Sequence, residues 1–335
     1  MSKEDFSRLY NEPAYIKLTS NKSRISEVDI LCPDINNSSL SYDNLVTNSE
    51  AIYLLTLEKA AGFKVSKRVE ILRVITDEII RASSHLFNLS ILAHTINDYS
   101  LMSKTIRTRS LVNDIKEIFW QNKLDYNISV LCGTKHDIDA MKHMKISKKI
   151  KELESKIDIL INSYETDDNV LNSTVNVGVL SKEQAQDYGI TGPVARGSGI
   201  NNDIRINVPY SIYSELKLNL IIKQNGDVHS RSMVRCLEIK ESISIIKQAM
   251  NMLSANRLII YKKLDFSEVE SSLRIEAPRG ELFCYLKTDK KANIVRKSIH
   301  VPSSMNWEVL KIVLKDNKTS NIPLILNSFD PCLCM

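Results

Sequence analysis

Apolar residues recur every three or four positions along most of the chain, and this spacing predicts a mainly helical protein. The clearest case is a helix over about 66–97, whose apolar positions form one broad face. Those positions are Val69, Leu72, Ile75, Ile79, Leu86, Leu89 and Leu92. A shorter helix begins near Asn48 and ends at Gly62, a residue suited to a helix C-terminus. Further helices are expected over 103–122, 137–163 and 232–253.

Two regions differ from this pattern. Residues 275–286, IEAPRGELFCYL, predict two short strands around a turn at Pro278 and Gly280. Residues 1–44 are polar, and we expect loops with a short strand. The predicted fold class is therefore mainly α with a small β part (α+β), divided into an amino-terminal segment (1–44) and a helical domain (45–335) with short β segments near 272–300.

The segment 181–213 contains four of the nine glycines in the chain. Glycine allows backbone conformations that other residues avoid, so we predict a tight, polar turn without regular repeats. Arg196, Asp203 and Arg205 lie within it, and burying them is costly unless each is paired. They should form an ion-pair network or line a cavity; an ordinary structural loop held by buried arginines is the alternative. The spacing is not GxGxxG, so no nucleotide-binding loop is expected.

Charged residues also interrupt the apolar pattern of two predicted helices. Glu78, Arg81 and His85 share one face of the long helix, and Arg235 and Glu238 share one stripe of the helix over 232–253. His85 could be a ligand or proton carrier, although a hydrogen-bonded core histidine is the favoured interpretation.

Composition excludes several classes of function. The net charge of +5 is spread out and only 6% of residues are aromatic, which does not favour nucleic-acid binding. No apolar run reaches the length of a membrane span. The six cysteines are scattered apart from Cys332 and Cys334, which predicts neither a disulfide framework nor a zinc ribbon. The amino terminus shows neither the apolar core of a secretion signal nor the composition of an organellar import sequence. We therefore expect the protein to be made in the compartment where it acts.

Five motifs, in order, carry a resemblance to a known family: NSEAIYLLTLEK, SKRVEILRVITDEIIRASSHL, YGITGPVARGSGINNDIR, GDVHSRSMVRCLEIKES and IEAPRGELFCYL. Together they resemble the quinone-site subunit of respiratory complex I (NADH:ubiquinone oxidoreductase), which descends from the large subunit of nickel–iron hydrogenases and is called NADH dehydrogenase subunit seven in organelles. The resemblance covers about 42–330.

The resemblance implies a helical-bundle body like that of the hydrogenase large subunit and a role as a core peripheral-arm subunit of a multisubunit, proton-pumping enzyme. With an iron–sulfur partner that carries the terminal cluster, it would form the cavity where ubiquinone, the substrate, is reduced. Other peripheral-arm and membrane-arm subunits are the remaining implied partners. No iron–sulfur cluster, nickel, NAD or flavin is expected on this chain. The implied location is the matrix side of the mitochondrial inner membrane, with the cytoplasmic face of a bacterial membrane as the alternative.

The family's quinone-binding residues are only partly matched. Its amino-terminal β-domain, with a head-group histidine, has no recognisable counterpart, and another chain could supply it. The family's head-group tyrosine aligns with Asp43, next to Tyr42, so either Tyr42 serves through a one-residue shift or the donor is absent from this chain. A set of ionisable residues is retained, as structural ion pairs or a proton path. The set comprises Glu78, Arg81, His85, Arg109, Arg196, Asp203, Arg205, Asp227, Arg231, Arg235 and Glu238.

Two alternatives remain open from the sequence. The chain could be a scaffold subunit of the same complex with an altered quinone site, or a hydrogenase-like large subunit. A hydrogenase holds nickel with two C-x-x-C pairs, since thiolates are the soft ligands that this metal selects. Here Cys334 lies one residue too close to Cys332, and Tyr42 and Leu45 stand where the first pair would lie. No metal site is therefore predicted.

Overall fold

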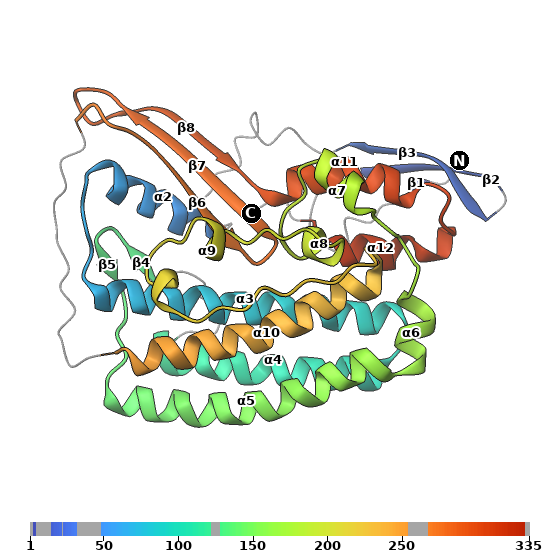
Figure 1. The fold of residues 1–335 in the computed structure, drawn as a ribbon, viewed down its shortest axis with the longest axis horizontal. Coiled ribbons are helices and arrows are strands. Elements are labelled where there is room, and N and C mark those ends of the chain that lie inside the picture. Colours follow the sequence, from blue (N-terminus) through green and yellow to red (C-terminus); the bar gives the residue numbers. More distant parts are fainter. Residues whose placement is uncertain are drawn as a thin grey trace.

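A computed structural model describes residues 3–4, 15–21, 23–31, 48–121, 128–253 and 267–331 of the 335-residue chain. Four long helices form its body: α3 (Lys67–Thr95), α4 (Tyr99–Trp120), α5 (Ala140–Thr166) and α10 (Val228–Asn251). They lie side by side, with α3 packed against both α4 and α10 (Figure 1). The predicted mainly α fold with a small β part is confirmed, and each long helix lies close to its predicted range.

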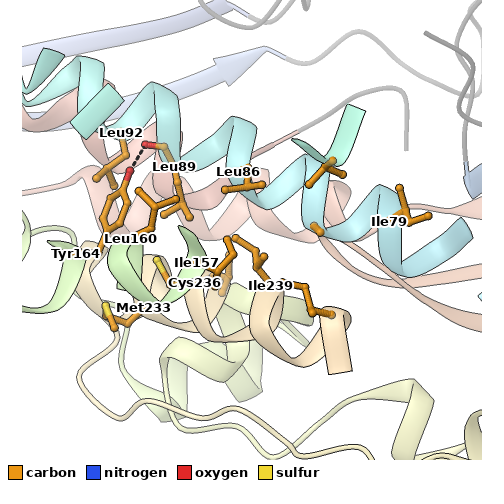
Figure 2. Close-up of a cluster of buried hydrophobic side chains, with 14 of the residues drawn as sticks. Ile79, Leu86, Leu89, Leu92, Ile157, Leu160, Tyr164, Met233, Cys236 and Ile239 are labelled. Atoms are coloured by element: carbon orange, nitrogen blue, oxygen red, sulfur yellow. Dashed lines mark hydrogen bonds between the residues drawn. The ribbon is translucent and has the colours of Figure 1, made fainter. Parts of the chain in front are cut away.

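The bundle is held together by apolar side chains from facing helices. Leu86 and Leu89 of α3 meet Leu160 of α5 and Ile239 of α10 in one buried cluster (Figure 2). The hydroxyl of Tyr164 on α5 donates a hydrogen bond to the Leu89 carbonyl at 2.7 Å, so this buried phenol is satisfied. Each such side chain contributes roughly 1.5–3 kcal/mol by leaving water. The apolar face predicted for the long helix is the face of α3 that packs in this cluster.

A small sheet packs beside the bundle. Strands β6 (Glu270–Ala277), β7 (Gly280–Thr288) and β8 (Ile294–His300) are antiparallel in that order. Helix α2 (Asn48–Ala60) covers one face, where Ile52 packs against Leu282 and Cys284. The two strands predicted around the Pro278 turn are confirmed, and they are longer than expected.

A second sheet lies in the amino-terminal part of the chain. It contains β1 (Lys3–Glu4), β2 (Tyr15–Asn21) and β3 (Arg24–Leu31), and β3 packs against α11 (Pro302–Leu314). The expectation of loops with a short strand is wrong here. The β2–β3 hairpin has a bulge between Thr19 and Ser20 that breaks the two-residue alternation on which strand prediction depends. A further two-stranded ribbon joins β4 (Ser129–Val130) and β5 (Gly133–Thr134).

The glycine-rich segment is built from short helices: α7 (Lys182–Asp187), α8 (Gly192–Gly197), α9 (Ile204–Asn207) and the 3₁₀ turn η2 (Tyr213–Glu215). The prediction of a polar turn needs correction, because every residue of α8 is buried and α8 packs against α10. The remaining elements are α6 (Asp168–Thr174), η3 (Thr319–Asn321) and α12 (Ile322–Phe329). This arrangement places the segment between α3, α10 and β6.

Candidate functional site

The centre of the candidate site is the carboxylate of Glu78, halfway along α3. It accepts hydrogen bonds from Ser242 Oγ at 2.6 Å, the Tyr213 hydroxyl at 2.7 Å and Arg205 Nη1 at 3.0 Å. Arg81 Nε lies 3.2 Å away on the next turn of α3. Burial alone would raise the pKa of Glu78, but the two arginines and the two hydroxyl donors lower that pKa to about 2. Glu78 is therefore a fixed negative charge at neutral pH.

A second carboxylate group surrounds Arg196, which α8 holds in the interior. Arg196 Nε donates to Glu238 Oε1 at 2.7 Å, and its Nη1 donates to Glu276 Oε1 at 2.8 Å. Asp203 Oδ2 is 3.6 Å from the same Nη1. Glu276 Oε2 also accepts the backbone N–H of Ile204 at 3.1 Å, at the start of α9. One guanidinium thus joins three acidic side chains from three parts of the chain.

Arg205 connects these two groups. Its Nε and Nη2 bind the two Asp203 oxygens at 3.0 and 2.7 Å, while its Nη1 reaches Glu78. Arg81 adds a link to the sheet, because its Nη1 and Nη2 donate to the carbonyls of Ala277 and Glu276 at 3.0 and 2.6 Å. We call the set made of Glu78, Arg81, His85, Arg196, Asp203, Arg205, Glu238 and Glu276 the buried network. It ties α3, α10, β6 and the glycine-rich segment together, and the ion pairs expected of Arg196, Asp203 and Arg205 are present.

His85 is attached to the edge of the buried network. Its Nε2 lies 2.8 Å from Glu238 Oε2, and burial lowers its pKa despite that carboxylate. At neutral pH the imidazole is therefore uncharged and Nε2–H donates to Glu238. The geometry is that of the hydrogen-bonded core histidine favoured from the sequence. His85 Nδ1 and Arg196 Nη2 are buried without a hydrogen-bond partner among the described residues, so the network keeps unused donor and acceptor capacity.

Four predicted residues lie outside the buried network. Arg109 on α4 donates from Nε to the Ser83 carbonyl at 3.2 Å and lies over the Phe87 ring. Asp227 caps α10 by accepting the Ser230 N–H at 2.7 Å.

Arg231 binds main-chain carbonyls, those of Gly226 at 2.6 Å and Gly178 at 2.9 Å. Arg235 Nη1 lies 3.3 Å from the Arg231 carbonyl, and its Nε is buried without a partner in the described part of the chain. Arg231 therefore holds two loops together, one at each of these carbonyls.

Some residues considered from the sequence cannot be placed in the structure, and one site residue was not predicted. Tyr42, Asp43, Cys332 and Cys334 lie outside the described residues. Tyr213 was not identified as a site residue, although it is the last residue of the glycine-rich segment. A lone tyrosine outside any long helix gives no periodic signal, and only the fold brings its hydroxyl to a residue 135 positions away.

Within the part of the chain that the structure describes, no helix is long and apolar enough to cross a bilayer. The same described residues contain no group of three or more His, Cys, Asp or Glu side chains placed to hold a metal ion.

The mainly helical body with its small sheets is that of a respiratory subunit related to hydrogenase large subunits. The chain belongs to the family described as "Respiratory-chain NADH dehydrogenase, 49 Kd subunit", whose model matches residues 96–265 and 256–335. The members of this family are subunits of multisubunit respiratory oxidoreductases, and this chain is one of them.

Three similar proteins illustrate the range of this family. The carbon monoxide-induced hydrogenase of Rhodospirillum rubrum is 33% identical over 340 residues, covering 96% of this chain and 94% of its own length. An NADH-quinone oxidoreductase subunit of Dehalococcoides mccartyi is 33% identical over 297 residues, covering 87% of this chain and 80% of the relative. A chain of the membrane-bound sulfane sulfur reductase, an archaeal respiratory membrane complex, shares the fold with a TM-score of 0.87 at 21% identity, covering 96% of this chain and 93% of that one.

Proposed function

We propose that this chain is the core subunit of a quinone-reducing NADH dehydrogenase and that it forms the quinone cavity with an iron–sulfur partner. The observation that carries the proposal is the similarity to the NADH-quinone oxidoreductase subunit of Dehalococcoides mccartyi, at 33% identity over 87% of the chain. NADH oxidation belongs to other subunits, since no nicotinamide or flavin signature occurs in the sequence. The body from residue 45 onward would act as one hydrogenase-like unit.

The chemistry of the proposed reaction fits a buried ionisable network. Reducing a quinone takes two electrons and two protons, so the site needs hydrogen-bond donors and a supply of protons. The network provides fixed charges in a region that excludes water, where electrostatic interactions are strong. His85 is neutral and donates a hydrogen bond to Glu238. The Nδ1 atom of His85 has no partner among the described residues, which suits a group that accepts and returns a proton.

For the quinone head group we propose Tyr42 as the hydrogen-bond donor, with Asp43 beside it. Both lie in the segment before α2, outside the described residues. The proposed partners are the subunit with the terminal iron–sulfur cluster, the other subunits of both arms and a separate chain that carries the family's head-group histidine. The similar proteins named above are from bacteria and an archaeon, which supports the cytoplasmic face of a bacterial membrane rather than the mitochondrial matrix side.

A hydrogenase-type reaction is the second candidate, and one observation favours it. The carbon monoxide-induced hydrogenase matches 96% of this chain, more than the NADH-quinone oxidoreductase relative does. Against it stands the cysteine pattern, because one residue separates Cys332 from Cys334 and no first C-x-x-C pair is present. A nickel site would then need ligands other than four thiolates. A scaffold role in a complex with an altered quinone site is the third possibility.

The test is inhibitor-sensitive NADH:quinone reductase activity in the native membrane complex, measured with the wild type, Tyr42→Phe and a control, Tyr188→Phe, at an exposed position. The proposal expects loss of quinone reduction in Tyr42→Phe with NADH:ferricyanide activity kept, and no change in Tyr188→Phe. Unchanged activity in Tyr42→Phe would assign the donor to another residue. Hydrogen evolution with stoichiometric nickel in the purified complex would replace the proposal with the hydrogenase function.

A further inference from the structure

A cavity of about 320 Å³ lies beside the buried network, between α2, α3, β6 and the residues that precede η2. Leu55, Phe63 and Leu273 supply much of its apolar wall. The volume is large enough for several water molecules. None of the residues predicted from the sequence as site residues lines it.

One stripe of α3 connects the cavity to the network. Glu70, Arg73 and Asp77 line the cavity, and their spacing of three and four residues places them on one face of the helix. Arg81, a network residue, comes four residues after Asp77 on the same face. The stripe therefore leads from the cavity to the network along a single rigid helix.

Asp77 is the acid of this stripe nearest to the network, one helical turn before Arg81. Arg73 is already engaged, because its Nη1 and Nη2 bind the two Glu58 oxygens at 2.7 Å each. Among the described residues, no hydrogen bond or ion pair reaches the Asp77 carboxyl. Burial and the neighbouring Glu78 raise its pKa to about 7, against the opposing effect of Arg81 and Arg73. Both forms of this carboxyl are thus populated near neutral pH.

Tyr210 separates the cavity from the network. It lines the cavity, and its hydroxyl accepts the backbone N–H of Glu276 at 3.3 Å. Its ring packs edge-on against Tyr213 at 4.9 Å, and Tyr213 in turn donates to Glu78. Burial raises the pKa of Tyr210, so its hydroxyl stays protonated and can only exchange one proton for another. Tyr210 therefore touches both the cavity and Glu276, a member of the buried network.

We propose that Asp77 is the port through which the buried network exchanges protons with water in this cavity. A proton from cavity water joins the Asp77 carboxylate. Water in the cavity, which both residues line, then carries a proton from this carboxyl to the Tyr210 hydroxyl, and the hydroxyl gives its own proton to the Glu276 carboxylate. Burial raises the pKa of Glu276, so this carboxylate is the member of the buried network that accepts the proton. Asp77 is then protonated again from the cavity. One proton enters and one leaves the port in each cycle, and no electron moves. The inference rests on the proposed function, since quinone reduction is what consumes the protons.

The pH dependence of the port follows from the charges around Asp77. Facing groups come from α2, the turn after it, α3, the segment before η2 and η2 itself. They are Glu58, Lys59, Lys64, Glu70, Arg73, Glu78, Arg81, Tyr210 and Tyr213. Because Asp77 loses its proton as the pH rises through about 7, proton supply to the network should weaken above that pH.

The experiment measures quinone reductase activity against pH in the native complex with Asp77→Asn, Asp77→Glu and Tyr210→Phe. The matched control is Asp158→Asn, an exposed acid that pairs with Lys240 at 2.7 Å. Asp77→Asn should lower kcat by roughly tenfold, below the full effect of a general acid at the reacting atoms. Its residual rate should no longer fall between pH 6 and 8, Asp77→Glu should restore the rate, and Tyr210→Phe should resemble Asp77→Asn.

The outcomes separate the two proposals. If Asp77→Asn or Tyr210→Phe assembles normally and keeps the wild-type rate and pH profile, the port is overturned and the proposed function stands. If the wild-type complex has no inhibitor-sensitive quinone reduction, the proposed function falls, and the port falls with it. An equal loss of rate in Asp158→Asn would also overturn the port, because the effect would not be specific to the cavity.

Discussion

Arg205 Nη1 and Glu78 Oε1 form a wholly buried ion pair at 3.0 Å, although 127 positions separate them in the chain. The pair fixes α9, within the glycine-rich segment, against the middle of α3. Arg205 holds Asp203 with its other two nitrogens, so each partner is satisfied on several sides. A charge taken from water at this depth is tolerated only with such complete pairing.

The first prediction concerns Arg205→Met. Removing the guanidinium leaves Glu78 and Asp203 buried with fewer partners, so we expect a loss of about 3–5 kcal/mol in the free energy of unfolding. The control is Lys240→Met, which breaks the exposed pair with Asp158 and should cost at most about 1 kcal/mol. Denaturant unfolding of the full chain measures both. Equal effects in the two variants would contradict a structural role for the network.

The second prediction follows from the lowered pKa of Glu78. This pKa is about 2 in the folded chain against an ordinary 4.5, so the charged form stabilises the fold at any pH above about 4.5. That stability should be lost as the pH falls from about 4.5 towards 2. Glu78→Gln should remove this part of the acid dependence, and its deficit relative to wild type should shrink below pH 4. A pH series of thermal unfolding curves tests this, and a deficit independent of pH would contradict it.

The network was only partly predictable from the sequence, and particular residues show why. Glu78, Arg81 and His85 were placed on one face because a helix has a fixed period. Arg196, Asp203 and Arg205 were expected to pair because buried charges require it. Tyr213 and Asp77 were not assigned to a site, since pairing across 135 positions and exposure to a cavity depend on how the elements pack.

The same distinction applies to the fold. The helices of the bundle have long, strongly periodic apolar stripes, and their positions were predicted well. The β2–β3 hairpin is short, polar and interrupted by a bulge, so its strands gave no clear alternation. Helix α8 is six residues long and wholly buried, too short for a periodic pattern to identify it.

The third prediction concerns Asp77, whose effect on stability depends on pH in the opposite direction to that of Glu78. The pKa of Asp77 is about 7 in the folded chain against an ordinary 3.8, so its charged form destabilises the fold. The contribution of Asp77 should therefore lower the free energy of unfolding of the wild type as the pH rises from about 4 to 7. Asp77→Asn should therefore melt higher than wild type at pH 8 and nearly equal to it at pH 4. The gain at pH 8 should be on the order of 1 kcal/mol or more, since each pKa unit corresponds to about 1.4 kcal/mol and cavity water screens part of it.

This stability measurement is independent of activity. The conservative control is Asp158→Asn, for which no gain is expected at either pH, because that side chain is 60% exposed. A lower melting temperature of Asp77→Asn at pH 8 would mean that the carboxylate is paired in solution, contrary to its position in the structure.

The fourth prediction uses two glycines of the glycine-rich segment that share a left-handed backbone. Gly189 has φ +60° with open space where a side chain would start, whereas a Cβ on Gly192, at φ +71°, would overlap the Arg279 carbonyl and lie 2.6 Å from Gly280 Cα. Gly189→Ala should cost only backbone strain, roughly 1–2 kcal/mol. Gly192→Ala should cost clearly more, because the β6–β7 turn must move away from α8, and this movement separates Arg196 from Glu276. Unfolding curves of both variants give the difference, and equal losses would show that the turn yields freely and that α8 is not held by this close approach.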